Sequence, residues 1–332
     1  MAELAGVSQS TVSYVMTGKR PISAATRAKV EAAMAQLRFH PNAGARALAG
    51  RRTNVIGLVV RLGVTTDMAG VLPFIDTVTS EAAARDFDVV LVTAEDGTAS
   101  MLRLAGRSLV DAIVLMDIQA HDERLATAAT LGIPVVLIGL STDNHGLDAV
   151  DFDFRRAGAL AVEELVASGQ RRIVVLGEPP EVAAKDFGFV AGFEDGAVEA
   201  ARLAEVPIVV LRPEVAGWRG MLELAPRLLE GREDGLGIVA RTPQAITWVQ
   251  QLMFIERLEP GHDIALVGLC TDALAQSFSV PVTNVSPEPD QVSRVAMARV
   301  FDLLDTDRPA GRIHLVPPRL THRETTPPRG DR

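Results

Sequence analysis

The N-terminal stretch carries polar side chains at a spacing suited to contacting the edges of DNA bases. They recur on one face of a helix expected directly after Ser8: Gln9, Ser10, Ser13, Tyr14 and Thr17. Ser8 and Thr11, at the start of this helix, complete the set. Amide and hydroxyl groups donate and accept hydrogen bonds, as the base edges in a major groove require. The sequence therefore predicts a helix that reads DNA.

A helix-turn-helix would hold these side chains in place. Ala2 is small enough to let two helices cross closely, and Gly6 supplies a turn at which a positive φ costs little. Ser8 is a good N-cap, and Val12 and Val15 give the second helix an apolar inner face. The Ala-x-x-x-Gly spacing alone favours a capped amphipathic helix of no special purpose. The whole string favours the DNA-binding motif.

A third helix and a short basic segment follow. Ser23 is the expected cap of a helix over residues 24–37. Asn42 caps a two-turn segment that ends at Gly50 and contains Ala45, Arg46 and Leu48. So short a helix is marginal in water, which suggests that it folds on DNA. Leu48 would then enter the minor groove between base steps, or would instead pack against the third helix.

Charge is divided unevenly along the 332 residues. Residues 1–52 hold eight basic and two acidic side chains, a net charge of +6, which leaves −15 for the rest because the whole chain carries −9. A basic head attracts phosphate, whereas DNA repels an acidic body. The division places the predicted DNA contacts in the head.

From Thr53 onward the pattern changes to short apolar runs that alternate with amphipathic stretches. Runs of this kind indicate parallel strands buried on both faces, so we expect an α/β body of doubly wound type. Eight runs are read as strands: residues 55–60, 88–93, 112–116, 134–138, 172–176, 207–211, 237–240 and 263–267.

We divide the body into two parallel-sheet lobes, because eight strands at this spacing are too many for one sheet. The expected organisation is a helix-turn-helix domain over residues 1–40 and a hinge helix with its linker over 41–53. The first lobe takes 54–150 with 282–313, the second lobe takes 151–281 with 314–325, and a tail takes 326–332.

Motifs of catalysis and of cofactor binding are missing from the sequence. It has no dinucleotide or phosphate-loop glycine pattern, no nucleophile elbow and no histidine pair at metal spacing. We therefore expect no enzyme activity, no cofactor and no metal. The single Cys270 forms no internal disulfide, no apolar run reaches roughly 18 residues, and no secretory signal is visible. These features predict a cytoplasmic protein that does not bind membranes.

Several motifs together resemble the LacI family of bacterial transcription regulators. The resemblance rests on residues 5–13 (AGVSQSTVS), 27–30 (RAKV), 39–42 (FHPN), 45–50 (ARALAG) and 54–58 (NVIGL), and it continues to residue 325. It implies a two-lobed sensor like that of periplasmic sugar-binding proteins, a small-molecule effector, a homodimer and a palindromic double-stranded DNA operator. Gln9, Ser10 and Tyr14 would read bases, and Leu48 would be the hinge leucine.

The resemblance also locates candidate effector contacts, some of which depart from the family's pattern. Positions that usually hold sugar hydroxyls carry Arg241, Cys270 and Phe189, so a simple sugar is in doubt. Phe74, Asp117, Asp153 and Asp272 remain at positions expected to face the cleft, and Trp218 and Trp248 could serve as stacking surfaces. Taken singly, each of these side chains also fits a structural role.

Two alternatives stay open, and one expectation concerns the start of the chain. The body alone would suit a two-lobed solute-binding protein, although the basic head argues against it. The altered cleft positions also fit a regulator that has lost its response to an effector. The family pattern has several more helical residues before the position that Met1 occupies, so we expect the true translation start to lie upstream of Met1.

Overall fold

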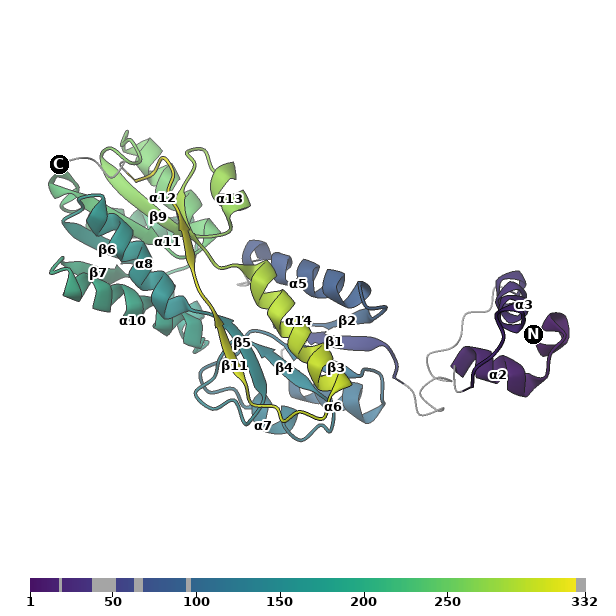
Figure 1. Ribbon diagram of the computed structural model, residues 1–332. Coiled ribbons are helices and arrows are strands. Elements are labelled where there is room, and N and C mark those ends of the chain that lie inside the picture. Colours follow the sequence, from purple (N-terminus) through teal and green to yellow (C-terminus); the bar gives the residue numbers. More distant parts are fainter. Residues whose placement is uncertain (18–19, 38–51, 63–67, 94–96, 327–332) are drawn as a thin grey trace. The chain divides into compact units, whose positions relative to one another are not determined.

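The computed structural model describes residues 1–17, 20–37, 52–62, 68–93 and 97–326. The chain divides into two units, Met1–Thr53 and Asn54–Arg332, which are described separately (Figure 1). Within the described residues, no helix has the length and apolar character that crossing a membrane requires.

The first unit is built from three helices, α1 (Ala2–Ala5), α2 (Gln9–Thr17) and α3 (Ala24–Gln36). Gly6 ends α1 in the left-handed region at φ 62°, which gives the expected turn. Ser23 caps α3 by accepting a hydrogen bond from the Thr26 N–H at 3.2 Å, as predicted. The core holds one buried side chain or more from every helix: Ala5, Val12, Val30 and Ala33. Leu37, the last residue of the expected helix, is the C-cap of α3 and is half exposed.

The first lobe of the second unit is a parallel sheet with the strand order β11-β5-β4-β3-β1-β2. Its strands are β1 (Val55–Val59), β2 (Asp88–Val92), β3 (Ala112–Leu115), β4 (Val135–Ile138), β5 (Asp148–Phe152) and β11 (Ile313–Val316). Its helices are α5 (Met68–Ala83), α6 (Gly97–Gly106), α7 (Arg124–Ala128) and α14 (Pro289–Asp305).

The second lobe has the strand order β12-β10-β9-β8-β6-β7, parallel except for β12. Its strands are β6 (Arg172–Leu176), β7 (Ile208–Leu211), β8 (Leu236–Ala240), β9 (Ile264–Leu269), β10 (Thr283–Ser286) and β12 (Arg319–Thr321). Its helices are α8 (Phe154–Ala167), α9 (Pro180–Ala183), α10 (Gly188–Leu203), α11 (Trp218–Leu228), η1 (Arg232–Asp234), α12 (Pro243–Ile255) and α13 (Asp272–Ser277).

Each of the eight apolar runs contains most or all of a strand, β1 to β4 or β6 to β9. The inner strands of the two sheets are buried as expected, whereas the edge strands β2 and β7 are partly exposed. Sequence reading missed β5, β10, β11 and β12, which are short or carry polar residues. β5 and β11 pair although neither was predicted as a strand, and Asp148 at the start of β5 supplies a reason. Its fully buried carboxylate accepts hydrogen bonds from the Gly311 and Arg312 N–H groups at 2.8 and 2.9 Å.

The observed strand positions differ from the expected lobe boundaries in three places. All of β5 lies in the first lobe's sheet, although the boundary was expected after Val150. β10 belongs to the second lobe, whereas residues 282–313 were assigned to the first. β11 completes the first lobe, although most of it was assigned to the second. The chain therefore passes between lobes after β5, after β10 and after β11.

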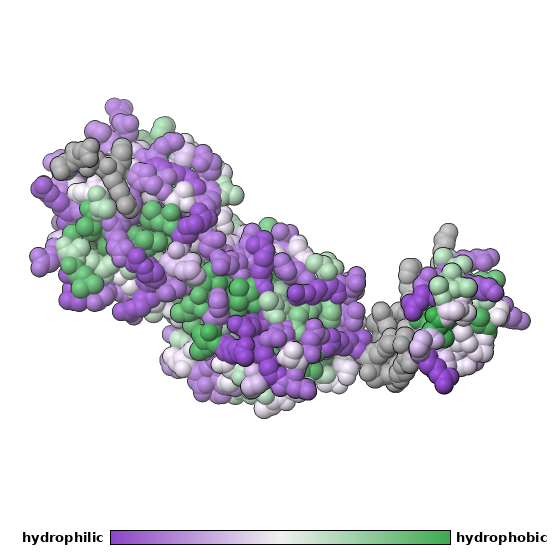
Figure 2. All heavy atoms as spheres, in the orientation of Figure 1, coloured by the Kyte–Doolittle hydropathy of each residue, from purple (hydrophilic) through white to green (hydrophobic). Residues whose placement is uncertain are grey.

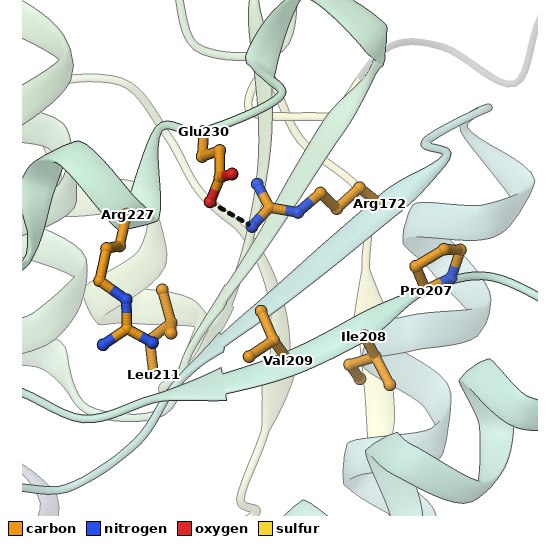
Figure 3. Close-up of a pocket in the computed structure, with 7 residues that line it drawn as sticks. All are labelled: Arg172, Pro207, Ile208, Val209, Leu211, Arg227 and Glu230. Carbon is orange, nitrogen blue, oxygen red and sulfur yellow. Dashed lines mark ion pairs between the residues drawn. The ribbon is translucent and has the colours of Figure 1, made fainter.

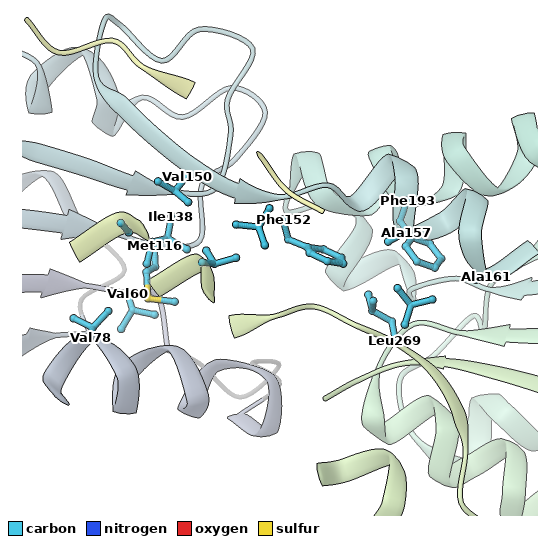
Figure 4. Close-up of a cluster of buried hydrophobic side chains, with 14 of the residues drawn as sticks. Val60, Val78, Met116, Ile138, Val150, Phe152, Ala157, Ala161, Phe193 and Leu269 are labelled. Carbon is cyan, nitrogen blue, oxygen red and sulfur yellow. The ribbon is translucent and has the colours of Figure 1, made fainter. Parts of the chain in front are cut away.

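One apolar cluster runs from the first lobe into the second through the segment that joins β5 to α8. Figure 4 shows side chains of both lobes on either side of this crossing, with Phe152 between them. Its members include Val60, Met116, Ile138, Val150, Phe152, Ala157, Phe193 and Leu269. The cluster therefore links the two sheets whose strand ends form the cleft described next.

Candidate functional site

Helix α2 presents a polar outer face above an apolar inner one. The Ser8 hydroxyl accepts a hydrogen bond from the Thr11 N–H at 3.1 Å and so caps the helix, as expected. Val12 is buried against the other helices, which turns Gln9, Ser10 and Ser13 toward solvent. Exposed amide and hydroxyl groups on a capped helix have the chemistry that base edges recognise.

Tyr14 lies on the same helix, partly exposed, with the Arg20 guanidinium 5.8 Å from its ring centroid. Arg20, Arg27 and Lys29 are exposed, which gives this unit cations suited to phosphate. Thr17 lies within α2, and its side chain is outside the described part of the structure. Four other predicted contacts lie outside the described residues: Asn42, Ala45, Arg46 and Leu48.

A cleft with a volume of about 470 Å³ lies between the lobes of the second unit. The residues that follow β1, β3 and β4 line it from the first lobe, and those that follow β6, β8 and β9 line it from the second. The carboxyl ends of parallel strands are where α/β folds bind ligands. The volume lies in the range of small-molecule sites.

Aromatic rings form one wall of this cleft. Phe187 and Phe189 stack with ring centroids 5.1 Å apart, and Phe154 lies 5.2 Å from Phe189. Phe152 meets Phe154 edge to face at 5.0 Å, and Phe74 lines the cleft from α5. A continuous apolar surface of this kind suits a ring or an aliphatic body.

Two cations in the cleft wall are held by neighbouring groups. Arg241 is almost fully buried, forms an ion pair with Glu178 and lies 5.5 Å from the Phe189 ring centroid. Arg61 contacts the buried Asp122 carboxylate at 3.5 Å and donates to the Asp117 carbonyl at 2.8 Å. Both guanidinium groups are therefore partly neutralised before any ligand arrives.

Asp117 and Asp151 are two carboxyl groups at strand ends in the first lobe. Burial raises the pKa of Asp117, although the Arg61 backbone N–H, which donates at 3.0 Å, and the Arg124 charge act in the opposite direction. Burial also raises the pKa of Asp151 to about 7, although its Oδ1 accepts the Phe152 N–H at 2.8 Å. The cleft therefore contains an acid that titrates near neutral pH.

The structure brings four of the seven predicted effector residues to the cleft: Phe74, Asp117, Phe189 and Arg241. The other three have structural partners. Asp153 caps α8 by accepting the Arg156 N–H at 2.9 Å. Asp272 contacts Arg319 at 2.5 Å and Arg323 at 3.0 Å. Trp218 packs against the second lobe's core, as does Trp248.

Sequence reading missed five lining residues that carry much of the site's chemistry: Arg61, Asp151, Glu178, Phe154 and Phe187. Arg61 and Glu178 each follow a buried strand within two residues, which is a signal that the sequence does contain. Asp151 lacked this signal because β5 was not predicted. Cys270 lines the cleft too, and burial raises the pKa of its thiol to about 12, so the thiol stays protonated.

The lobes also contact each other at the rim of the cleft. The Gln119 side chain donates to the Lys185 carbonyl at 2.7 Å, and the Ala120 N–H donates to the Asp186 carbonyl at 2.7 Å. His121 lies with its Nδ1 3.0 Å from the Asp186 carboxylate. The segment after α9 therefore bridges the rim and joins the second lobe to the first.

A smaller hollow of about 210 Å³ lies beside β7, the edge strand of the second sheet (Figure 3). Arg172 and Glu230, which form an ion pair at 3.6 Å, line it together with Arg227 and residues of β7. Its lining shares no residue with that of the inter-lobe cleft.

Sequence profiles of known families cover almost the whole chain. Residues 1–42 match "Bacterial regulatory proteins, lacI family". Residues 54–225 match "Periplasmic binding proteins and sugar binding domain of LacI family", and residues 162–326 match "Periplasmic binding protein-like domain". The chain belongs to the LacI family. This LacI-family member is a helix-turn-helix transcription regulator, and the match over its head decides against the solute-binding alternative.

Individual relatives support the assignment over the full length. The transcriptional regulator CelR of Thermobifida fusca is 28% identical over 318 residues, 91% of this chain and 89% of CelR. The lactose operon repressor of Escherichia coli (strain K12) is 26% identical over 333 residues, 98% of this chain and 89% of the repressor.

Solved structures show the same fold. The lac repressor dimer bound to operator and an anti-inducer has a TM-score of 0.83 at 21% identity, and the match covers 98% of both chains. The CelR–cellobiose complex has a TM-score of 0.70 at 23% identity, with the same coverage. Both matches extend over the head and the two α/β lobes.

Proposed function

We propose that this LacI-family regulator is a repressor that binds a palindromic operator as a homodimer and responds to a small molecule in its inter-lobe cleft. The polar outer face of α2, held by a capped start and the buried Val12, carries the DNA-binding part of this proposal. Two such helices in one dimer would enter successive major grooves about 34 Å apart.

Each predicted DNA contact has a chemical task in this proposal. Gln9 would read a base with its amide, and Ser10, Ser13 and Tyr14 would contact base edges through their hydroxyl groups. Ser8 and Thr11, near the start of α2, would contact the phosphate backbone, and Thr17 would contact a base edge. Asn42, Ala45, Arg46 and Leu48 would form a hinge at the minor groove, with Leu48 between two base steps.

The effector part of the proposal rests on the cleft at the strand ends. Phe74, Asp117, Phe189 and Arg241 are proposed as effector contacts because they line it from both lobes. Asp153, Trp218 and Asp272 serve the fold instead, through the cap, core and ion-pair contacts described above. A ligand held by both lobes would change the angle between them and so the spacing of the two heads.

The dimer part of the proposal is supported by exposed apolar side chains on two helices. Phe254 and Ile255 at the end of α12 are 84% and 57% exposed, and Leu72 on α5 is 58% exposed. Apolar patches interrupt the otherwise hydrophilic surface (Figure 2). Exposed aromatic and aliphatic groups of this kind are typical of interfaces between subunits.

The regulator is proposed to act in the cytoplasm, where its operator is accessible, and to act by binding rather than by catalysis. The cleft thiol, which burial keeps protonated, fits a binding role. CelR and the lac repressor are transcription regulators, as their names state.

Fluorescence anisotropy with the full chain tests the proposal. Labelled DNA from the promoter beside its own gene is compared with a random duplex of equal length, and specific binding is expected to be tighter by a factor of about 10³ or more. Tyr14→Ala should change the preferred sequence by roughly 1–3 kcal/mol of discrimination. Lys29→Ala is the control, because a phosphate contact would weaken binding to both duplexes alike.

Equal affinity for the two duplexes would overturn the operator proposal. The effector part is tested separately by thermal denaturation in the presence of a metabolite panel. If specific DNA binding is present and no compound raises the melting temperature, the protein is a regulator without effector control.

A further inference from the structure

Asp151 is the carboxyl group of the cleft on which no positive charge from the described residues acts. It lies at the end of β5, partly buried, and accepts hydrogen bonds from the backbone N–H groups of Phe152 and Leu140. Among the described residues, no Arg, Lys or His forms an ion pair with it, and the charge that acts on it is the like charge of Asp153. Burial raises the pKa of Asp151 to about 7, because no opposite charge offsets the cost of burying the ionised carboxylate.

The other charged groups of the cleft wall already interact with opposite charges. Glu178 pairs with Arg241, Arg61 contacts Asp122, and the charges of Arg124, Arg61 and Lys185 act on Asp117. A bound anion would therefore meet guanidinium groups that are largely neutralised, and it would add to the negative charge near Asp151. A bound cation would instead provide the counter-ion that Asp151 lacks.

Several polar groups of the cleft wall already take part in hydrogen bonds within the protein, which reduces the number left to hold a sugar. Thr242 and Thr271 use their hydroxyl oxygens to cap α12 and α13, accepting from Ala245 and Leu274 at 3.2 and 3.4 Å. The Gln119 amide donates to the Lys185 carbonyl. What the cleft offers a ligand is mainly apolar surface, the Asp151 carboxyl group without a counter-charge, and the buried Arg241 Nε–H, which has no hydrogen-bond partner among the described residues.

The aromatic wall favours the same kind of ligand. Phe154, Phe187 and Phe189 pack in a chain with centroids 5.1 and 5.2 Å apart, and Phe74 lines the cleft from α5. Ring faces attract cations and pack against apolar groups. Arg241, 5.5 Å from the Phe189 centroid, is an example of that attraction within the protein itself.

We propose that the effector of this cleft is an amine: a compact aromatic or aliphatic body held by the phenylalanine wall, with an ammonium group that pairs with Asp151. The inference rests on the proposed role of the cleft as the effector site, and it names the chemical class that this site selects. Asp151 would be the residue that decides this selection, by charge.

Three probes with the same ring and different head groups test the proposal: benzylamine, benzyl alcohol and benzoate. Binding to the full chain is measured by titration calorimetry at a pH one unit above the Asp151 value of about 7, where its carboxylate is ionised. Benzylamine is expected to bind about tenfold tighter than benzyl alcohol, and benzoate more weakly than either. Cellobiose is titrated alongside as a neutral sugar.

Two carboxyl-to-amide variants locate the effect. Asp151→Asn should abolish the preference for benzylamine over benzyl alcohol while leaving the affinity for the alcohol close to that of the wild type. Asp307→Asn, on an exposed loop outside the cleft, should leave all affinities unchanged. If Asp151→Asn does not fold, the order of the wild-type affinities for benzylamine, benzyl alcohol and benzoate still decides whether the cleft prefers an amine.

Three results would overturn the proposal that the effector is an amine. They are equal affinity for benzylamine and benzyl alcohol, tighter binding of benzoate than of benzylamine, and tighter binding of cellobiose than of benzylamine. If the wild type prefers benzylamine and Asp151→Asn keeps the same preference, the role of Asp151 is overturned. DNA binding of the wild-type chain is measured on the same sample. Its loss argues against the proposed function, whereas intact DNA binding without an amine preference argues against this inference alone.

Discussion

Asp151 and Asp153 are separated by one residue and have opposite surroundings. The Asp153 carboxylate accepts the Arg156 N–H at the start of α8, where the helix end favours a negative charge. The Asp151 carboxyl lies in the cleft wall, where burial and the neighbouring Asp153 charge disfavour ionisation. Asp153, at a position where the family resemblance led us to expect a ligand contact, therefore stabilises a helix. Asp151, two residues earlier, lines the cleft.

The raised pKa of Asp151 predicts a pH dependence of stability. The pKa of Asp151 is about 7 in the folded chain, whereas the usual pKa of an aspartate carboxyl is 3.8. Between these values the folded chain keeps a proton that the unfolded chain releases, so this group's contribution to stability falls as pH rises through that window and then levels off. Each unit of pKa difference is worth about 1.4 kcal/mol.

Asp151→Asn should remove this fall, since an amide does not titrate. Urea unfolding of the wild type and the variant from about pH 4 to pH 8 checks it, with Asp307→Asn as the control. The variant's stability relative to the wild type should rise across the window. If the free energies of unfolding of the two proteins depend on pH in the same way, the pKa of Asp151 is not raised in the folded chain.

At the scale of elements, the contact between α8 and α10 depends on two glycines. A Cβ on Gly158 would lie 2.0 Å from the Phe193 carbonyl oxygen, and one on Gly196 would lie 1.9 Å from the Arg155 carbonyl oxygen. Both neighbours are backbone atoms of the facing helix, which cannot rotate away. The two helices approach this closely because neither has a side chain at the crossing.

Gly158→Ala should therefore force α8 and α10 apart and destabilise the second unit by about 1–3 kcal/mol. Gly106→Ala at the end of α6 is the matched control, because a Cβ there has no heavy atom within 4 Å. That control should change stability by less than about 1 kcal/mol. Denaturant midpoints measure both variants, and an equal effect of the two substitutions would contradict the close crossing.

At the scale of the whole molecule, the most exposed large apolar side chain tests the proposed dimer surface. Phe254 is 84% exposed at the end of α12, more than any other large apolar side chain among the described residues. Leaving a phenylalanine in water forgoes roughly 1.5–3 kcal/mol of burial. A partner subunit seated on α12 would recover this free energy.

Phe254→Glu should shift the protein toward monomer, because a charge would be buried at the interface. Sedimentation velocity measures the shift, and operator affinity should fall in parallel because two heads are needed to contact both half-sites. Leu203→Glu, on a side chain of α10 that is 69% exposed, is the control and should leave the dimer intact. A Phe254→Glu protein that sediments as a dimer would place the interface elsewhere.

The sequence alone determined what depends on local order. Gly6, Ser8 and Ser23 specify the turn and caps of the helical head through contacts within a few residues. The eight β-branched runs specify strands by their own apolarity. These signals were sufficient for the fold class and the helix-turn-helix, whereas the four residues that do line the cleft were located through the resemblance to the LacI family.

Only the tertiary structure decided what depends on distant partners. β11 lies beside β5 because a buried carboxylate, Asp148, accepts hydrogen bonds from Gly311 and Arg312, more than 160 residues along the chain. Asp272 is neutralised by Arg319 and Arg323 on the returning segment and is withdrawn from the cleft. Among the residues that the structure describes, Asp151 has no such partner, and the free energy of burying its charge is set by groups that sequence spacing does not reveal.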